Sequence, residues 1–317
     1  MTASSSAFAA APAGGSPTGA AAINTTGLCK RYGDTTALDQ LDLTVNAGEV
    51  YGYLGPNGAG KTTTIRLLLG LHRPSSGRAE VFGVDAWSEP VTAHRRVAYV
   101  AGEPFLWPSL TGRETLEFLA NLHGDTDAAY CDELVERFQL DDRRKVRALS
   151  KGNRQKVALI AALATRADLL LLDEPTSGLD PLMEVAFRVC VQEAKERGQT
   201  IFLSSHILSE VEALCDRVGI LRDGRLVDEG TLGELRHLAA QTVEVTFEDG
   251  TPELPPLEGV SVLAAGPKAL RLSVSGDIGP LIVALAKHPI TSLTSREPSL
   301  EEIFLHHYDG SEPGGHR

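Results

Sequence analysis

Residues 55–62 read Gly-Pro-Asn-Gly-Ala-Gly-Lys-Thr, and this stretch, here called the phosphate loop, decides the fold of the chain. It fits the pattern G-x-x-x-x-G-K-[ST], in which glycines let backbone N–H groups turn inward around phosphate oxygens. A strand is expected before it, at residues 50–54, and a helix after it, at residues 63–71, whose positive end faces the phosphates. The residues expected to bind a nucleotide here are Gly55, Pro56, Asn57, Gly58, Ala59, Gly60, Lys61, Thr62 and Thr63.

An acidic stretch lies farther along the chain. Four leucines lead into Asp173, and Glu174 follows it. Because Mg²⁺ prefers oxygen ligands, Thr62 and Asp173 are expected to bind the ion, directly or through water. Glu174 is expected to act as the general base that takes a proton from attacking water, while Lys61 supplies a positive charge to the phosphates. Together the two stretches predict binding and cleavage of ATP; a solvated acidic turn is the alternative for the second.

The composition is that of an ordinary soluble globular protein, with 42% hydrophobic and 23% charged residues. No apolar run approaches the roughly eighteen residues that cross a bilayer, so any membrane role is expected to come from a partner. The formal net charge of -12 argues against broad nucleic-acid binding, which needs lysine and arginine opposite the phosphates. Four widely spaced cysteines are expected to be reduced thiols in a cytoplasm, namely Cys29, Cys131, Cys190 and Cys215.

The chain is expected to divide into two folded parts. Short apolar runs between turn signals predict an α/β nucleotide-binding domain of the P-loop NTPase type over residues 23–238, with a helical insertion at about residues 110–165. A small α+β domain is expected over residues 239–308. The ends, residues 1–22 and 309–317, are expected to be disordered tails; the first lacks the basic start of a signal peptide.

Individual elements follow from the same patterns. Runs that are apolar throughout predict parallel strands buried on both faces, with ligands bound at their carboxyl ends. The expected strands of the first part are residues 23–28, 38–45, 50–54, 169–172, 200–203, 218–221 and 225–227, followed by a helix at 232–238. In the second part, strands are expected at residues 242–247, 269–274 and 290–294, and helices at 278–287 and 300–308.

Residues 149–157, Leu-Ser-Lys-Gly-Asn-Arg-Gln-Lys-Val, resemble the signature sequence of ATP-binding cassette (ABC) proteins. Lys151 and Asn153 depart from the glycine and glutamine that are usual there. Ser150 and Gly152 open an amphipathic helix whose free N–H groups and dipole can hold a γ-phosphate, which in the family belongs to the opposite subunit. The same segment is also expected to pack as an ordinary N-capped core helix.

The resemblance extends from about residue 26 to residue 232 and implies an ABC nucleotide-binding domain with antiparallel β and helical subdomains. By position, Tyr32 matches the aromatic residue that stacks on adenine; a buried structural tyrosine is the alternative. Asp180 ends residues 177–180, which match the D-loop that crosses to the partner subunit, where a plain turn is the alternative. His206 matches the switch histidine that contacts the γ-phosphate and orients the catalytic site, although an isolated histidine is more often structural.

One position departs from the family. Where ABC proteins carry a glutamine that contacts Mg²⁺ and the attacking water, this chain has Gly102, followed by Glu103. Gly102 has no side chain for that role. Two hypotheses stand for Glu103: it joins the metal site, where a third negative charge is costly unless the ion neutralises it, or it shapes a docking surface for a membrane partner.

Among ABC proteins, the chain most resembles the ATPases of bacterial drug- and antibiotic-resistance exporters, at residues 110–112 and in its ending at residues 298–304. The resemblance implies an ATP-hydrolysing subunit that forms a homodimer around two ATP molecules through its nucleotide-binding domains. It also implies a separate membrane-spanning permease, which binds the transported drug, antibiotic or other hydrophobic compound and holds this subunit at the cytoplasmic face of the cell membrane. No nucleic-acid partner is expected.

A soluble ABC ATPase that acts on ribosomes or nucleic acid is the alternative function. Such proteins commonly carry two cassettes or long coiled coils, whereas this sequence has one phosphate loop, no sustained heptads and an acidic balance. The C-terminal part is expected to brace the dimer, and a regulatory ligand sensor is the other interpretation of it.

Overall fold

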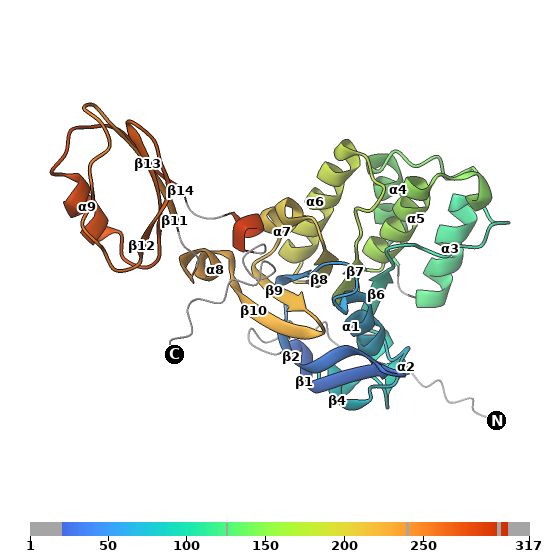
Figure 1. Ribbon diagram of the computed structural model, residues 1–317. Helices are drawn as coiled ribbons and strands as arrows, with labels where there is room; N and C mark the ends of the chain where they lie inside the picture. The colour runs from blue at the N-terminus through green and yellow to red at the C-terminus, as the bar shows by residue number, and fades with distance from the viewer. Residues whose placement is uncertain (1–20, 125, 239–240, 297–298, 304–317) are drawn as a thin grey trace, which may run out of the picture.

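The computed structural model of the chain describes residues 21–124, 126–238, 241–296 and 299–303 (Figure 1). The expected C-terminal tail and all but two residues of the expected N-terminal tail lie outside these ranges. For those two residues the tail prediction is wrong, because Ala21 and Ala22 begin the first strand and Ala22 is fully buried. Within the described ranges, no helix combines the length and the apolar character that crossing a bilayer requires.

A six-stranded, mostly parallel sheet forms the centre of the larger part of the molecule (Figure 1). Its strands are β3 (Val50–Leu54), β6 (Val97–Val100), β7 (Leu169–Asp173), β8 (Thr200–Ser205), β9 (Arg217–Arg222) and β10 (Arg225–Thr231). The order is β10-β9-β3-β8-β7-β6, and only β10 is antiparallel to its neighbour. The register pairs Leu54 with Ser205 and Asp173 with Ser204, so the phosphate loop and both carboxyl ends lie side by side.

An antiparallel sheet packs on one side of this central sheet. It has the order β2-β1-β4-β5 and consists of β1 (Ala21–Tyr32), β2 (Thr35–Asn46), β4 (Ser76–Val81) and β5 (Val84–Asp85). Helix α1 (Lys61–Leu68), which follows the phosphate loop, contacts both sheets, and the short helix α2 (Pro90–His94) lies beside β5. The shared core includes Tyr51 of β3, whose ring stacks on Phe202 of β8 with centroids 5.8 Å apart.

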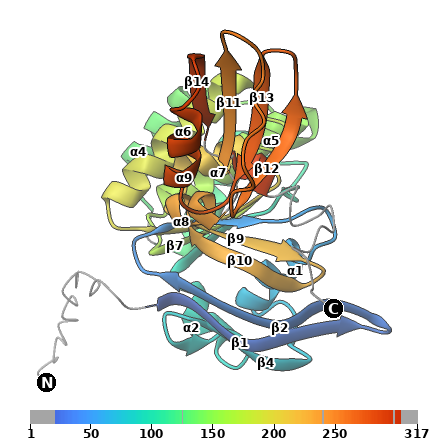
Figure 2. The ribbon, with the colours of Figure 1, turned by 60° about the vertical axis from the view of Figure 1, so that its left-hand side comes forward.

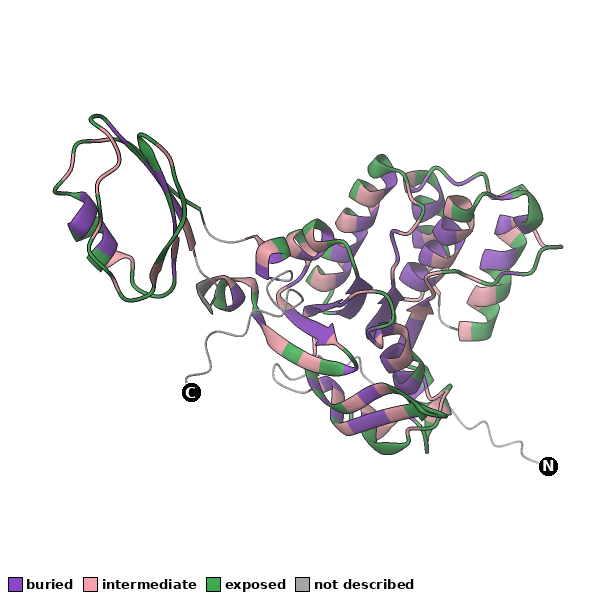
Figure 3. Ribbon diagram, in the orientation of Figure 1, coloured by how far each residue is buried: buried purple, intermediate pink, exposed green. Residues whose placement is uncertain are grey.

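Helices cover the opposite face of the central sheet (Figure 3). Three of them, α3 (Gly112–His123), α4 (Ala128–Arg137) and α5 (Lys151–Ala164), lie within the range of the expected insertion. The other two are α6 (Pro181–Glu196) and α7 (Leu208–Leu214). Successive side chains of a strand point to opposite faces, so in β7 Leu170 and Leu172 join the helical core while Leu169 and Leu171 join the core beneath the antiparallel sheet.

The C-terminal part begins after α8 (Leu232–Leu238) with a separate four-stranded antiparallel sheet (Figures 1 and 2). Its order is β12-β13-β11-β14, from β11 (Gln241–Phe247), β12 (Val260–Ala265), β13 (Ala269–Val274) and β14 (Ile290–Arg296). Helix α9 (Gly279–Leu285) packs Leu281 and Leu285 against this sheet in a core of their own. The sequence patterns did not predict β12, an edge strand whose side chains are mostly exposed.

Residues 300–303 return to the larger part of the molecule. They are helical, as predicted, and the rest of the predicted helix, residues 304–308, lies outside the described residues. Leu300 and Ile303 are buried in the helical core of the nucleotide-binding part, and the Leu300 N–H donates a hydrogen bond to Glu212 Oε1 at 2.9 Å. Their assignment to the small α+β part is therefore wrong for these four residues, because an amphipathic pattern does not say which core receives the apolar face.

Candidate active site

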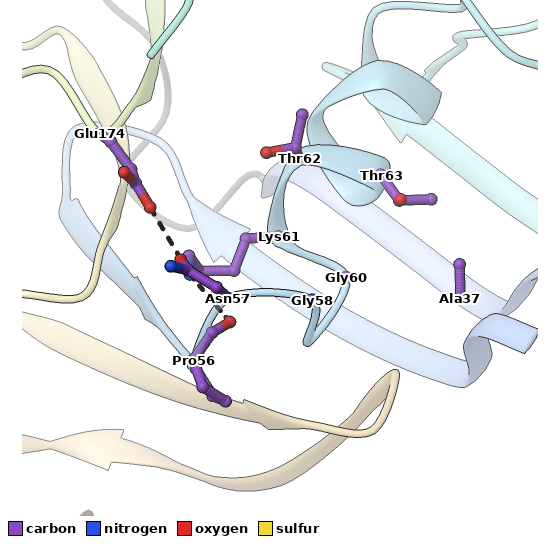
Figure 4. A pocket seen from close by; sticks show the side chains of 9 residues that line it. All are labelled: Ala37, Pro56, Asn57, Gly58, Gly60, Lys61, Thr62, Thr63 and Glu174. Atoms are coloured by element: carbon purple, nitrogen blue, oxygen red, sulfur yellow. Dashed lines mark hydrogen bonds and ion pairs between the residues drawn. The ribbon is translucent and has the colours of Figure 1, made fainter.

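A pocket opens at the phosphate loop (Figure 4). Its lining residues are Ala37, Pro56, Asn57, Gly58, Gly60, Lys61, Thr62, Thr63 and Glu174. All of these except Ala37 are residues that the sequence predicted for the site. Ala37 lines the pocket because the start of β2 lies beside the loop at Gly60. Gly60 has φ +114° and precedes α1; a Cβ on it would lie 2.6 Å from the Ala37 carbonyl oxygen, so only glycine fits there.

The Lys61 ammonium lies inside the loop that carries it. Its Nζ donates a hydrogen bond to the carbonyl oxygen of Gly55 at 2.6 Å. It also donates to the carbonyl oxygen of Pro56 at 3.2 Å and is 3.8 Å from Glu174 Oε1 (Figure 4). Burial lowers the pKa of Lys61, and the carboxylates of Glu174 and Asp173 oppose that change. The loop thus holds a desolvated cation where a phosphate would meet it.

Oxygen donors converge on Asp173. The Thr62 hydroxyl donates to Asp173 Oδ2 at 2.9 Å, and the Ser204 hydroxyl donates to Oδ1 at 2.6 Å. Within the described residues there is no group of three or more His, Cys, Asp or Glu side chains that could hold a metal. One carboxylate with one hydroxyl nevertheless fits Mg²⁺, which binds few protein oxygens and takes the rest from water and substrate phosphates. Ser204 was missed as a site residue, although it directly follows the apolar run of β8.

Glu174 lies between Lys61 and His206. Its Oε1 is 3.3 Å from His206 Nδ1, so the same oxygen faces the Lys61 ammonium and the His206 imidazole. The backbone of Glu174 has φ 48°, in the left-handed region that non-glycine residues rarely adopt, and its N–H donates to the Ser204 carbonyl oxygen at 3.0 Å. The adjacent strand therefore holds a strained turn that directs this carboxylate toward the pocket.

Tyr32 lies outside this pocket but remains accessible. It is 42% exposed, which excludes the alternative of a buried structural tyrosine. Its hydroxyl meets His72 Nδ1 at 2.5 Å, and the Lys30 ammonium lies 4.8 Å from the ring centroid. Stacking on adenine stays a prediction for Tyr32.

The signature segment and the D-loop form one packed unit within the chain. Ser150 caps α5, accepting the Asn153 N–H at 3.2 Å, and Asp180 caps α6 in the same way. A Cβ on Gly152 would lie 2.2 Å from the Gly178 carbonyl oxygen, so glycine is needed for this close approach. Ser150, Gly152 and Asp180 do not line the pocket of the same chain. Their contact with a nucleotide, which the resemblance to the family assigns to a second molecule, stays a prediction.

Gly102 and Glu103 face different surroundings. A Cβ on Gly102 would lie 3.1 Å from the Asp173 carbonyl oxygen, so this glycine is the residue that packs against the acidic stretch. Glu103 is exposed and lines a groove between β6, α3 and α5, together with Phe105, Leu119 and Ala158. Of the two hypotheses for Glu103, the geometry favours the docking surface.

The fold and this geometry define a P-loop ATPase: a phosphate loop after a central parallel strand, with an Asp-Glu pair and a histidine at the neighbouring strand ends. The chain matches the family model described as ABC transporter over residues 38–177. A solved structure titled as the ATP binding subunit of an ABC transporter superposes with a TM-score of 0.64 at 34% identity, covering 68% of this chain and 91% of that one.

Two relatives extend the match. The chain is 39% identical over 302 residues to the daunorubicin resistance ATP-binding protein DrrA3 of Streptomyces coeruleorubidus, covering 90% of this chain and 95% of the relative. It is 40% identical over 230 residues to the bacitracin transport ATP-binding protein BcrA of Bacillus licheniformis, covering 72% of this chain and 75% of the relative. The chain belongs to the ATP-binding proteins of ABC transporters, which confirms the resemblance, the α/β P-loop fold and the ATPase assignment.

Proposed function

We propose that this ATPase is the energy-supplying subunit of an exporter for a drug, antibiotic or other hydrophobic compound. The observation that carries the proposal is the meeting of Lys61, Thr62, Asp173, Glu174 and His206 in one site, in a chain similar over nearly its whole length to a daunorubicin resistance protein. A separate membrane-spanning permease binds the transported compound and holds the chain at the cytoplasmic face of the membrane.

Transport into inverted membrane vesicles tests this assignment. Vesicles that contain the chain and its permease should accumulate a hydrophobic antibiotic when ATP is added. Vesicles with the Glu174→Gln variant should not. Purification of the chain with ribosomes or nucleic acid, and not with a membrane protein, would support the soluble alternative instead.

In the proposed hydrolysis, each group of the site has one task. The Lys61 ammonium leaves the loop carbonyls for the phosphate oxygens, and Glu174 accepts the proton of the attacking water. His206 orients Glu174 and contacts the γ-phosphate. Thr62 and Asp173 hold Mg²⁺, which when bound neutralises charge on the phosphates. Tyr32 stacks on the adenine ring.

We also propose that two copies complete each other's sites. Ser150 and Gly152 at the start of α5 present free backbone N–H groups, which suit the γ-phosphate on the partner copy. Asp180 and the rest of the D-loop pack against that same segment, so both reach the partner together. The nucleotide-binding domain ends near residue 238. The C-terminal domain, with the sheet β12-β13-β11-β14, braces this dimer.

The groove beside Glu103 is the proposed docking surface for the permease. Phe105 is 95% exposed there, so it contributes little to the folded chain alone. We expect Phe105→Ala to keep the free ATPase rate within about twofold but to weaken co-purification with the permease by about tenfold or more, the loss typical of a truncated aromatic anchor. Glu103→Ala is expected to act in the same direction with a smaller effect.

The control is Trp87→Ala, since Trp87 is also an exposed aromatic residue but does not line the groove. Unchanged permease binding and transport in both the Phe105 and Glu103 variants would remove the docking role.

A further inference from the structure

A buried carboxylate lies directly behind the proposed switch histidine. Glu210 lies on α7, which begins two residues after His206. It is only 4% exposed. Its Oε2 accepts a hydrogen bond from the Ser205 hydroxyl at 2.8 Å. Its Oε1 is buried and makes no hydrogen bond of ordinary geometry among the residues that the structure describes, although the Thr176 hydroxyl lies close enough to lower the pKa of the carboxyl group. Burying a carboxylate with so few partners costs free energy, so its hydrogen bond with Ser205 is expected to serve a function.

Ser205 connects this carboxylate to the backbone on the other side of His206. The hydroxyl that donates to Glu210 also accepts the Ile207 N–H at 2.9 Å. A hydroxyl has one proton to donate and two lone pairs, so both bonds are made at once. The turn over residues 205–207 is thereby closed, and His206 is the residue that projects from it.

The two serines that end β8 serve different sides of the strand. Neighbouring strand residues point to opposite faces. Ser204 donates to Asp173 on the side of the phosphate loop, whereas Ser205 donates to Glu210 on the side of α7. One strand end therefore joins the metal-binding carboxylate to the buried one.

The surroundings of Glu210 are mostly uncharged. Burial raises the pKa of Glu210, and the hydroxyls of Ser205 and Thr176 oppose that rise. The charged groups that face it from α6 are Glu184 and Arg188, which act in opposite directions. No cation pairs with Glu210 at salt-bridge distance among the described residues, and the Ser205 hydroxyl donates its hydrogen bond at 2.8 Å.

We propose that Glu210 is a positioning residue for His206. It fixes the Ser205 hydroxyl, and Ser205 fixes the turn that holds the imidazole 3.3 Å from Glu174. This inference rests on the proposed role of His206 in hydrolysis. It assigns a function in catalysis to a residue that touches neither the nucleotide loop nor the acidic pair.

Steady-state ATP hydrolysis by the full chain tests the proposal. Glu210→Leu and Ser205→Ala should each lower kcat by about tenfold while KM and nucleotide affinity stay within about twofold, because the bond orients a catalytic group and does not bind substrate. Glu210→Gln should keep most of the rate, since its carbonyl oxygen still accepts from Ser205. In a His206→Ala background, Glu210→Leu should cause no further loss.

Glu212→Leu is the matched control. It also removes a carboxylate from α7, but that carboxylate contacts Arg236 and Leu300 and not the turn over residues 205–207. Wild-type rates in both Glu210→Leu and Ser205→Ala would overturn the inference, as would an equal loss from Glu210→Leu with and without His206. If Glu210→Leu does not fold, Ser205→Ala decides the question. A full rate in His206→Ala would instead overturn the proposed role of His206, and the inference with it.

Discussion

The Glu174→Gln variant is expected to bind ATP normally but to hydrolyse it about 10²–10⁴-fold more slowly, the range lost when a general base is removed. The amide has nearly the size of the carboxylate and keeps a carbonyl oxygen for His206, but it does not take a proton from water. Glu174 is positioned to accept that proton because it lies at the end of a strand, between Lys61 and His206.

Two measurements check this expectation. Single-turnover hydrolysis should be slow, while the affinity for a fluorescent ATP analogue should stay within a few-fold of the wild type. Glu117→Gln makes the same change on the exposed surface of α3 and should leave hydrolysis unaltered. Near-normal turnover by Glu174→Gln would show that another group accepts the proton.

The Lys61→Ala variant is expected to lose nucleotide affinity by roughly ten- to a hundredfold, because a hydrogen bond to a charged group contributes about 1.5–3 kcal/mol. The Lys61 side chain is 5% exposed, and its ammonium is held inside the loop by the carbonyls of Gly55 and Pro56. Alanine leaves the phosphates without this buried charge and Glu174 without one of its partners. Hydrolysis should fall together with binding.

Thermal unfolding with and without ATP separates lost binding from lost folding. A ligand that binds only the folded state raises the melting temperature, so ATP at a given concentration should stabilise the wild type more than Lys61→Ala. Lys287→Ala removes the same charge from an exposed position of the C-terminal part and should behave as the wild type. Equal ATP-induced stabilisation of the wild type and Lys61→Ala would contradict the assignment of Lys61.

Five of the six central strands and the phosphate loop could be predicted because their signals are local; the sequence patterns did not predict the sixth, β6. The loop is defined by eight consecutive residues, and the four leucines before Asp173 are buried on both faces of the sheet, as a continuous apolar run predicts. Residues 151–164 form the helix that the signature pattern predicts, with Ser150 as its cap. In each case neighbouring residues alone determine the structure.

The features that could not be predicted depend on contacts between distant segments. Strand β12 has an exposed side-chain pattern and exists because it pairs with β13. The sequence shows that Leu300 and Ile303 are apolar, but it does not show which core buries them. Their burial in the core of the larger part is a tertiary contact. The partner of Asp173 at the end of β8, Ser204, likewise comes from 31 residues away, and no spacing pattern identifies it.

The central claim is that each nucleotide is hydrolysed in a site completed by Ser150 of a second copy. The most direct test measures the ATPase rate per chain across a wide range of protein concentrations, with light scattering on the same samples to give the fraction of dimer. We predict that the rate per chain follows the dimer fraction in the presence of ATP and Mg²⁺. If the ATPase rate per chain stayed constant down to concentrations at which light scattering detects only monomer, the central claim would be contradicted.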